Sequence, residues 1–124
     1  MAKVLLVGYV PELLQEPERL LRSAGHEVIM ALSFDAASTA IQEGAVQESS
    51  IDVAVFGFRI PEAERNQLAA DLMQACPAAK IIMVYFASIN NTELADALMP
   101  TTASAEEILR AVNHMLAKGR DRAG

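Results

Sequence analysis

The side chains that could carry acid–base, nucleophilic or metal chemistry in this sequence are few and widely spaced. His26 and His114 have no Ser, Cys, Asp or Glu at a spacing typical of a catalytic triad or a metal site. We interpret both as surface or structural histidines. Cys76 is the one cysteine of the sequence, so it forms no internal disulfide, which favours a reducing compartment. We interpret its thiol as a packing group at a helix end rather than as a reactive nucleophile.

Charged residues near the predicted strand ends are better placed for chemistry. Glu12, Glu62 and Glu64 each stand at the start of a predicted helix. They could contribute to a metal site, but the helix macrodipole also stabilises a carboxylate there, and we favour this second interpretation. Arg59 could bind an anion or pair with Glu62, and we favour the exposed ion pair. Asp52 stands before a predicted strand, at the opposite end, where we expect it to end a loop and bond locally.

Short apolar runs along the chain predict β-strands. They are not interrupted by polar residues, as is typical of parallel strands that helices cover on both faces. Segments patterned for helices or for compressed connections separate them, and this alternation predicts an α/β fold with a doubly wound, five-stranded parallel sheet in a three-layer sandwich. The runs are Val4–Val7, Val28–Leu32, Val53–Phe56, Ile81–Phe86 and Ala97–Met99.

Capping and helix-breaking residues predict the bounds of the helices. Ser33 is expected to cap the second helix, and Ser104 and Glu107 to form a capping box at the start of the last. Pro17 predicts a kink in the first helix, or a start delayed to about Pro17, because proline removes a backbone donor. The helices are expected at about Pro11–Ala24, Phe34–Gly44, Glu62–Ala75 and Ser104–Gly119.

The connection between the last two predicted strands is short. Only about eight residues, Ala87–Leu94, separate them, whereas a parallel crossover usually needs a dozen or more. We therefore expect the fourth helix of a regular doubly wound fold to be shortened or missing. One face of the sheet is then poorly covered at this edge.

Length and charge exclude several classes of function. The 124 residues, 52% of them hydrophobic, suit one domain, expected at residues 1–119 with a flexible tail at 120–124. A net charge of −6 argues against binding to nucleic acid or to an anionic membrane. No apolar stretch approaches the roughly 18 residues of a membrane span, and no signal peptide is evident. We expect a cytoplasmic protein.

Several short motifs occur in a fixed order. Together they resemble the receiver domain of two-component response regulators over residues 3–118, although none is specific alone. The resemblance implies a CheY-like, flavodoxin-like sandwich in a bacterial phosphorelay. The motifs are Val4-Leu5-Leu6-Val7 before Pro11, Ala24-Gly25-His26-Glu27-Val28, Ile51-Asp52 leading to Ile60-Pro61, Ile81-Ile82-Met83-Val84, and Met99-Pro100 before a capped helix.

The resemblance also indicates which positions would carry the family's chemistry. That chemistry uses two acidic residues for Mg²⁺, an aspartate that accepts a phosphoryl group, a hydroxyl and a lysine. The matching positions here are Gly8 and Tyr9, Gly57, Phe86, and Met99. An acyl phosphate needs a carboxylate nucleophile, and the metal needs oxygen ligands. The resemblance therefore implies a degenerate acceptor pocket with no phosphoacceptor, no metal ligands and no catalytic residue.

Our first functional hypothesis is a pseudo-receiver, a phosphorylation-independent signalling module that is not an enzyme and has no cofactor. Its partner would be a protein: a kinase, a regulator or a second copy in a homodimer. Neither nucleic acid nor membrane is expected as a partner. Ile89, Leu94 and Leu98 are the expected interaction surface, since the short connection leaves apolar groups near the last strand.

The alternative hypothesis is a small-ligand sensor. Open α/β sheets bind ligands at the carboxyl ends of their strands, where Tyr9, Phe58, Phe86 and Met99 would line an apolar cleft. These side chains could equally collapse into the vacated space, and we favour that interpretation. A third hypothesis, an ordinary phosphoacceptor with a displaced aspartate, has the least support.

Overall fold

The structure is a computed structural model, and it describes residues 2–46, 51–57, 60–85, 96–100 and 104–123. Within these ranges, the side chains of residues 44–46, 85, 97–100 and 118–123 are not described. None of the described helices is both long enough and apolar enough to cross a bilayer.

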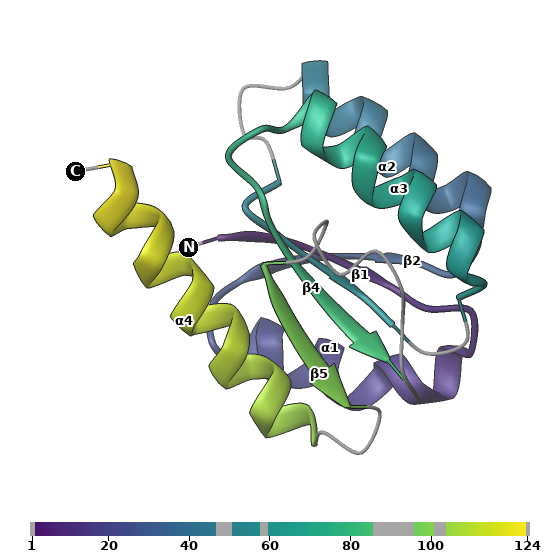
Figure 1. The fold of residues 1–124 in the computed structure, drawn as a ribbon. Coiled ribbons are helices and arrows are strands. Elements are labelled where there is room, and N and C mark those ends of the chain that lie inside the picture. Colours follow the sequence, from purple (N-terminus) through teal and green to yellow (C-terminus); the bar gives the residue numbers. More distant parts are fainter. Residues whose placement is uncertain (1, 47–50, 58–59, 86–95, 101–103, 124) are drawn as a thin grey trace.

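A parallel sheet forms the centre of the fold (Figure 1). The described residues contribute five strands, in the order β2-β1-β3-β4-β5. Every neighbouring pair is parallel, and the register aligns Val4 with Val28 on one side and with Val53 on the other. The strands are β1 (Lys3–Val7), β2 (Glu27–Ala31), β3 (Val53–Phe56), β4 (Lys80–Tyr85) and β5 (Ala97–Pro100).

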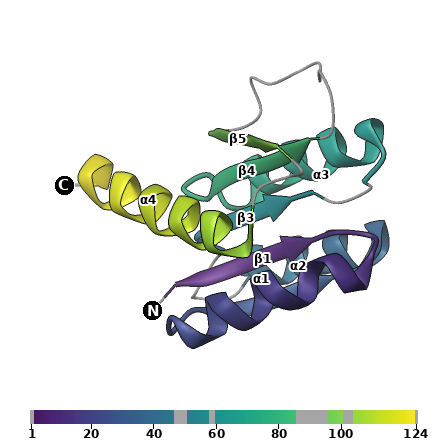
Figure 2. The ribbon, with the colours of Figure 1, turned by 90° about the horizontal axis from the view of Figure 1, so that it is seen from below.

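Helices cover both faces of this sheet, as the apolar runs predicted (Figures 1 and 2). The helices α1 (Pro11–Ser23) and α4 (Ala105–Ala123) pack on one face, and α2 (Phe34–Val46) and α3 (Glu62–Ala75) pack on the other. Successive strand residues point to opposite faces, so two buried cores result. Leu5 and Phe56 join the α2–α3 core, while Leu6 and Val55 join the α1–α4 core. The doubly wound parallel α/β prediction is confirmed.

The start of α1 corrects one prediction. The helix begins at Pro11 and continues past Pro17, so the delayed start is wrong. Pro17 is buried in line with Leu14 and Leu21 on the sheet-facing stripe. Burial of this stripe outweighs the one backbone hydrogen bond that the proline removes.

Two glycines predicted to end helices do not do so. The helix α2 continues past Gly44 to Val46, and α4 continues past Gly119 to Ala123, so residues 120–123 are helical. Glycine inside a helix costs about 1 kcal/mol relative to alanine, which is too little to stop a helix already under way. The glycine after α1 was predicted correctly: Gly25 has a φ of 95°, which favours glycine.

The predicted caps are confirmed. The Ser33 hydroxyl accepts a hydrogen bond from the Ala36 backbone N–H at 3.1 Å. At the start of α4, Glu107 accepts from the Ser104 N–H at 3.0 Å and the Ser104 hydroxyl accepts from the Glu107 N–H at 3.1 Å. These bonds lower the pKa of the Glu107 carboxyl. The predicted gap between the last two strands falls on residues 86–95, outside the described residues, so the shortened fourth helix stays a prediction.

Candidate functional site

Two buried glycines end the central strands at the carboxyl-end edge of the sheet. Gly8 directly follows β1 and Gly57 directly follows β3. The Gly57 N–H donates to the Val7 carbonyl at 3.1 Å, and the Gly8 N–H donates to the Ala31 carbonyl at 3.1 Å. Each bond extends the sheet ladder by one residue, so the two glycines continue the backbone pairing of the strands.

Gly57 has no room for a side chain. A Cβ atom built there would lie 2.6 Å from the Val84 Cβ and 3.0 Å from the Val84 Cγ2. The Val84 Cβ is fixed by the β4 backbone, so no rotation of a side chain relieves this contact. Gly57 does not have a positive φ, and the restriction is therefore one of space, not of backbone conformation. An aspartate at this position would need the β3 and β4 backbones to separate.

Gly8 is less restricted. A Cβ atom there would lie 2.9 Å from the Leu14 Cδ2 and 3.3 Å from the Gly57 carbonyl oxygen. The first contact is with the far end of a flexible side chain, which can move. Leu14 and Val84 are both buried, so apolar side chains fill the space beside the two glycines.

Tyr9 connects this edge to α3. Its hydroxyl donates to the Glu64 carboxylate at 2.6 Å. Burial raises the pKa of the Tyr9 phenol, and the hydrogen bond and charge of Glu64 and the charge of Asp35 raise it further. The phenol therefore keeps its proton and acts as a donor, not as a ligand for a cation.

The remaining predicted site residues fall wholly or partly outside the described residues. Phe86 is outside the described residues, as are Phe58 and Arg59. The backbone of Met99 pairs with that of Val84 in the sheet, but its side chain is not described. Of the predicted interaction surface, Ile89 and Leu94 are outside the described residues. The backbone of Leu98 in β5 pairs with that of Met83 in β4, and the side chain of Leu98 is not described.

The carboxylates occupy the expected helix starts. Glu12 lies in the first turn of α1, and Glu62 and Glu64 lie in the first turn of α3. The bond from Tyr9 shows that Glu64 also faces the strand-end edge. Glu62 lies 3.9 Å from the buried Arg65. In the described part of the chain, His, Cys, Asp and Glu do not gather in threes that could hold a metal ion.

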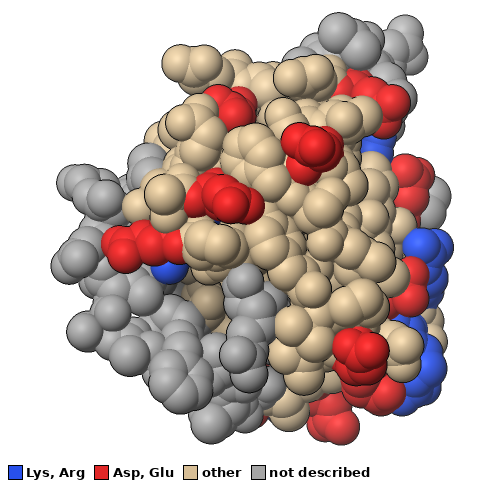
Figure 3. All heavy atoms as spheres, turned by 90° about the vertical axis from the view of Figure 1, so that its right-hand side faces the viewer, with Lys and Arg blue, Asp and Glu red and all other residues tan. Residues whose placement is uncertain are grey.

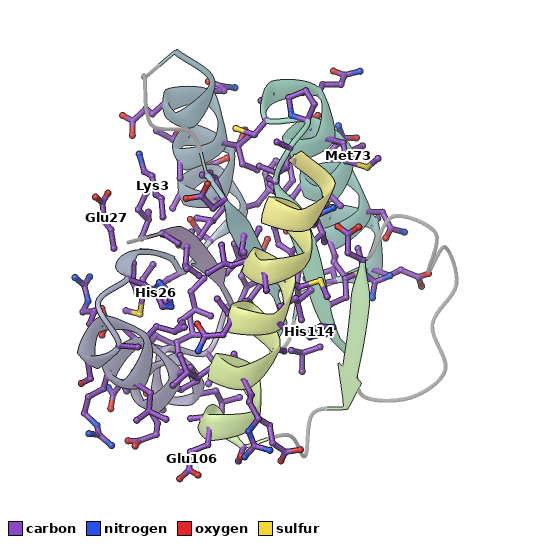
Figure 4. All side chains as sticks on the ribbon, turned by 90° about the vertical axis from the view of Figure 1, so that its left-hand side faces the viewer. Lys3, His26, Glu27, Met73, Glu106 and His114 are labelled. Carbon is purple, nitrogen blue, oxygen red and sulfur yellow. The ribbon has the colours of Figure 1, made fainter. Side chains whose placement is uncertain are left out.

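Asp52 lies at the amino-terminal edge, as expected, and its hydrogen bonds to the described residues reach distant parts of the chain. Its carboxylate accepts from the Lys3 N–H at 2.8 Å, and its carbonyl accepts from the Lys80 N–H at 2.9 Å. These partners start the neighbouring strands β1 and β4. At the same edge, Lys3 and Glu27 begin β1 and β2 as a register pair (Figure 4).

The cysteine and His114 lie where they were expected, whereas His26 is satisfied at one ring nitrogen only: its Nδ1 atom is buried with no hydrogen-bond partner among the described residues. The ring Nε2 of His26 lies 2.9 Å from the Asn113 Oδ1, which links the start of β2 to α4 (Figure 4). His114 is exposed on α4. Cys76 is buried next to the end of α3, as a packing residue.

Two features of the site were missed by the sequence reasoning. The first is the contact between Gly57 and Val84, which follows from the register that aligns Phe56 with Met83. No local pattern in the sequence indicates this register. The second is the Tyr9–Glu64 hydrogen bond, since no local pattern relates residues 55 positions apart.

Comparison with known proteins gives a result for structure only. No protein-family model matches the chain, and a search of curated proteins finds no match. Solved structures match over nearly the whole length. A CheY-like response regulator receiver domain protein from Methanospirillum hungatei JF-1 has a TM-score of 0.83 and 21% identity, covering 98% of each chain.

Two further structures are similar. Response regulator TrrA from Thermotoga maritima, in complex with Mg²⁺-BeF, has a TM-score of 0.76 and 19% identity, covering 94% of this chain and 100% of its own. A response regulator receiver domain protein from Clostridium thermocellum has a TM-score of 0.78 and 19% identity, covering 97% of this chain and 98% of its own. The chain therefore has the CheY-like receiver fold, in agreement with the resemblance in the sequence.

Proposed function

We propose that the chain is a phosphorylation-independent, receiver-like signalling module that acts by protein–protein interaction in or beside a two-component phosphorelay. The fold supports the signalling context, because receiver domains of response regulators share it at TM-scores of 0.76 to 0.83. In this proposal Gly8, Tyr9, Gly57, Phe86 and Met99 occupy the positions of a degenerate acceptor pocket. The module is not an enzyme and needs no cofactor.

The observation that carries the proposal is the contact between Gly57 and β4. A phosphoacceptor requires a carboxylate at the end of the third strand, and Gly57 stands there with 2.6 Å between a built Cβ and the Val84 Cβ. The loss of the carboxylate is thus matched by the packing around it. The close approach of β4 to Gly57 favours a function of the protein surface over phosphoryl chemistry at the strand ends.

The surrounding groups support the same proposal. Glu64 is a carboxylate that reaches this edge, but its oxygen accepts the Tyr9 hydrogen bond. A carboxylate engaged in this way is a weaker nucleophile. The described residues give the small-ligand alternative no comparable support: Leu14 and Val84 lie next to Gly8 and Gly57, and of the predicted lining the side chain of Tyr9 is described.

Incubation with acetyl phosphate and Mg²⁺ tests the proposal. The intact mass of the protein is expected to stay unchanged, while a phosphorylatable receiver domain treated in parallel gains a phosphoryl group. A stable, magnesium-dependent phosphoryl adduct on this chain would contradict the proposal. If Glu64 carried such an adduct, Glu64→Gln would remove it.

A further inference from the structure

Apolar residues gather on the carboxyl-end face, by which we mean the described residues that follow β1, β2 and β3 and begin α1, α2 and α3. Tyr9, Val10, Phe34 and Ile60 are half-buried there, and Leu32 is 39% exposed. Leu32 lies just outside β2, although the apolar run predicted it as a strand residue. The described helices pack on the two broad faces of the sheet and do not extend over this edge (Figures 1 and 2).

Carboxylates surround these apolar residues. Glu12 lies in the first turn of α1, Asp35 in the first turn of α2, and Glu62 in the first turn of α3. Glu64 is near enough to accept a hydrogen bond from Tyr9, and the charge of Asp35 also acts on the Tyr9 phenol. Figure 3 looks onto this face and shows acidic groups spread over a largely uncharged surface.

The described cations do not neutralise this face. Lys3 and Lys80 begin β1 and β4 at the opposite edge. Arg19 and Arg22 pair with Glu16 and Glu18 along α1, and Arg110 on α4 acts on Glu107 of the same helix. Among the described residues, the cation next to a carboxylate of the face is Arg65, which is buried and lies 3.9 Å from Glu62. The described part of this face therefore carries more negative than positive charge around an apolar centre.

We propose that the carboxyl-end face binds an amphipathic, lysine- and arginine-rich segment of a partner protein. Apolar side chains of that segment would cover Val10, Leu32 and Ile60, and its cations would pair with the surrounding carboxylates. A second copy of this chain is a poorer occupant, because two molecules of net charge −6 repel each other. This inference rests on the proposed function as a protein-binding module and names the chemistry of its partner.

The test measures binding of a short, labelled, amphipathic helical peptide built from leucine and lysine. Two triple variants of the full chain are compared, and each removes three of the charges that contribute to the net charge of −6. The face variant is Glu12→Gln, Asp35→Asn and Glu62→Gln. The matched control, with its changes away from the face, is Glu27→Gln, Glu43→Gln and Asp71→Asn.

The face variant is expected to bind the peptide about tenfold more weakly than the control at low salt, with a smaller salt dependence. In the unchanged chain, the peptide is expected to shift the amide resonances of Tyr9, Leu32 and Ile60 first. This second readout does not depend on how well the variants fold. A twin peptide with glutamate in place of lysine is expected not to bind.

Equal weakening in the two variants would overturn the inference, since it would show attraction by net charge alone. Amide shifts confined to other surfaces would overturn it as well. So would light scattering that shows self-association lost only in the face variant. The peptide-binding assay contains neither Mg²⁺ nor a phosphoryl donor, so a lack of peptide binding leaves the proposed function standing. An acyl phosphate in the separate acetyl phosphate assay would contradict the proposed function, whether or not the peptide binds.

Discussion

At the scale of residues, Gly57 and Val84 define the character of the strand-end edge. The absence of a side chain at residue 57 is visible in the sequence, but its consequence for packing is not. In the structure, β4 occupies the space that a side chain would need, with the Val84 Cβ at 2.6 Å from a built Cβ. Restoring a carboxylate by a single substitution is therefore not expected to restore a receiver site.

The addition of a Cβ atom at residue 57 tests the close approach of Gly57 to Val84. Gly57→Ala is expected to destabilise the protein by about 2 kcal/mol, because the new methyl group overpacks against a backbone-fixed atom. In the double variant with Val84→Gly, the loss should be smaller than the sum of the two single losses by about 1 kcal/mol or more. Urea unfolding of the four proteins measures this coupling.

Gly8→Ala is the matched control for that exchange. Its Cβ would meet the flexible end of Leu14 at 2.9 Å, so its loss of stability should be smaller than that of Gly57→Ala. Strictly additive effects of Gly57→Ala and Val84→Gly would contradict the packing account.

Tyr9→Phe tests the link between β1 and α3. Removal of the phenol hydroxyl should reduce the free energy of unfolding by about 1 kcal/mol at neutral pH, because it removes one net hydrogen bond. The pKa of Tyr9 is raised in the folded state, so the folded state holds this proton more tightly than the unfolded state. Its contribution is complete below the ordinary tyrosine pKa of about 10 and is lost as pH rises toward the folded value.

The difference in stability between the unchanged chain and Tyr9→Phe should therefore narrow above about pH 10. Urea unfolding at neutral and at alkaline pH measures it. A difference that stays constant or widens with alkaline pH would show that the Tyr9 hydroxyl is not the proton donor to Glu64.

At the scale of elements, the sequence predicted starts better than ends. The hydroxyl of Ser33 and the pair of Ser104 and Glu107 satisfy backbone groups at fixed distances along the chain, so local pattern was sufficient. The helix ends predicted at Gly44 and Gly119 are wrong, because the end of a helix depends on tertiary packing as well as on local propensity. The delayed start predicted from Pro17 is wrong for the same reason, since Pro17 is buried with Leu14 and the helix continues through it.

Ser33→Ala tests the cap of α2. The variant is expected to lose about 1 kcal/mol of stability, because the Ala36 N–H loses its side-chain acceptor. Thr39→Ala, at an exposed position inside the same helix, is the control and should be neutral or slightly stabilising. Thermal unfolding followed by circular dichroism compares the two, and an equal loss in both would contradict the role of Ser33 as a cap.

At the scale of the whole molecule, the order of apolar runs was enough to predict the parallel sheet and its helical layers. Burial on both faces leaves a simple pattern of continuous apolar strands, and this pattern is local. The site was predicted only in part. Gly8, Tyr9 and Gly57 follow the ends of their strands, as predicted, whereas Val84 and Glu64 approach them through strand register and through a contact across 55 positions of sequence. Neither relation can be read from local patterns.

The central claim is that a receiver fold has lost its switch chemistry and works through its surface. The most direct measurement is a titration of the isotope-labelled chain with beryllofluoride and Mg²⁺, followed by amide resonances, with the Thermotoga maritima TrrA protein, solved with Mg²⁺-BeF, as the positive control. We predict that the resonances of Gly8, Tyr9 and Gly57 stay unchanged while those of the control move. New magnesium-dependent resonances at these three residues would contradict the account.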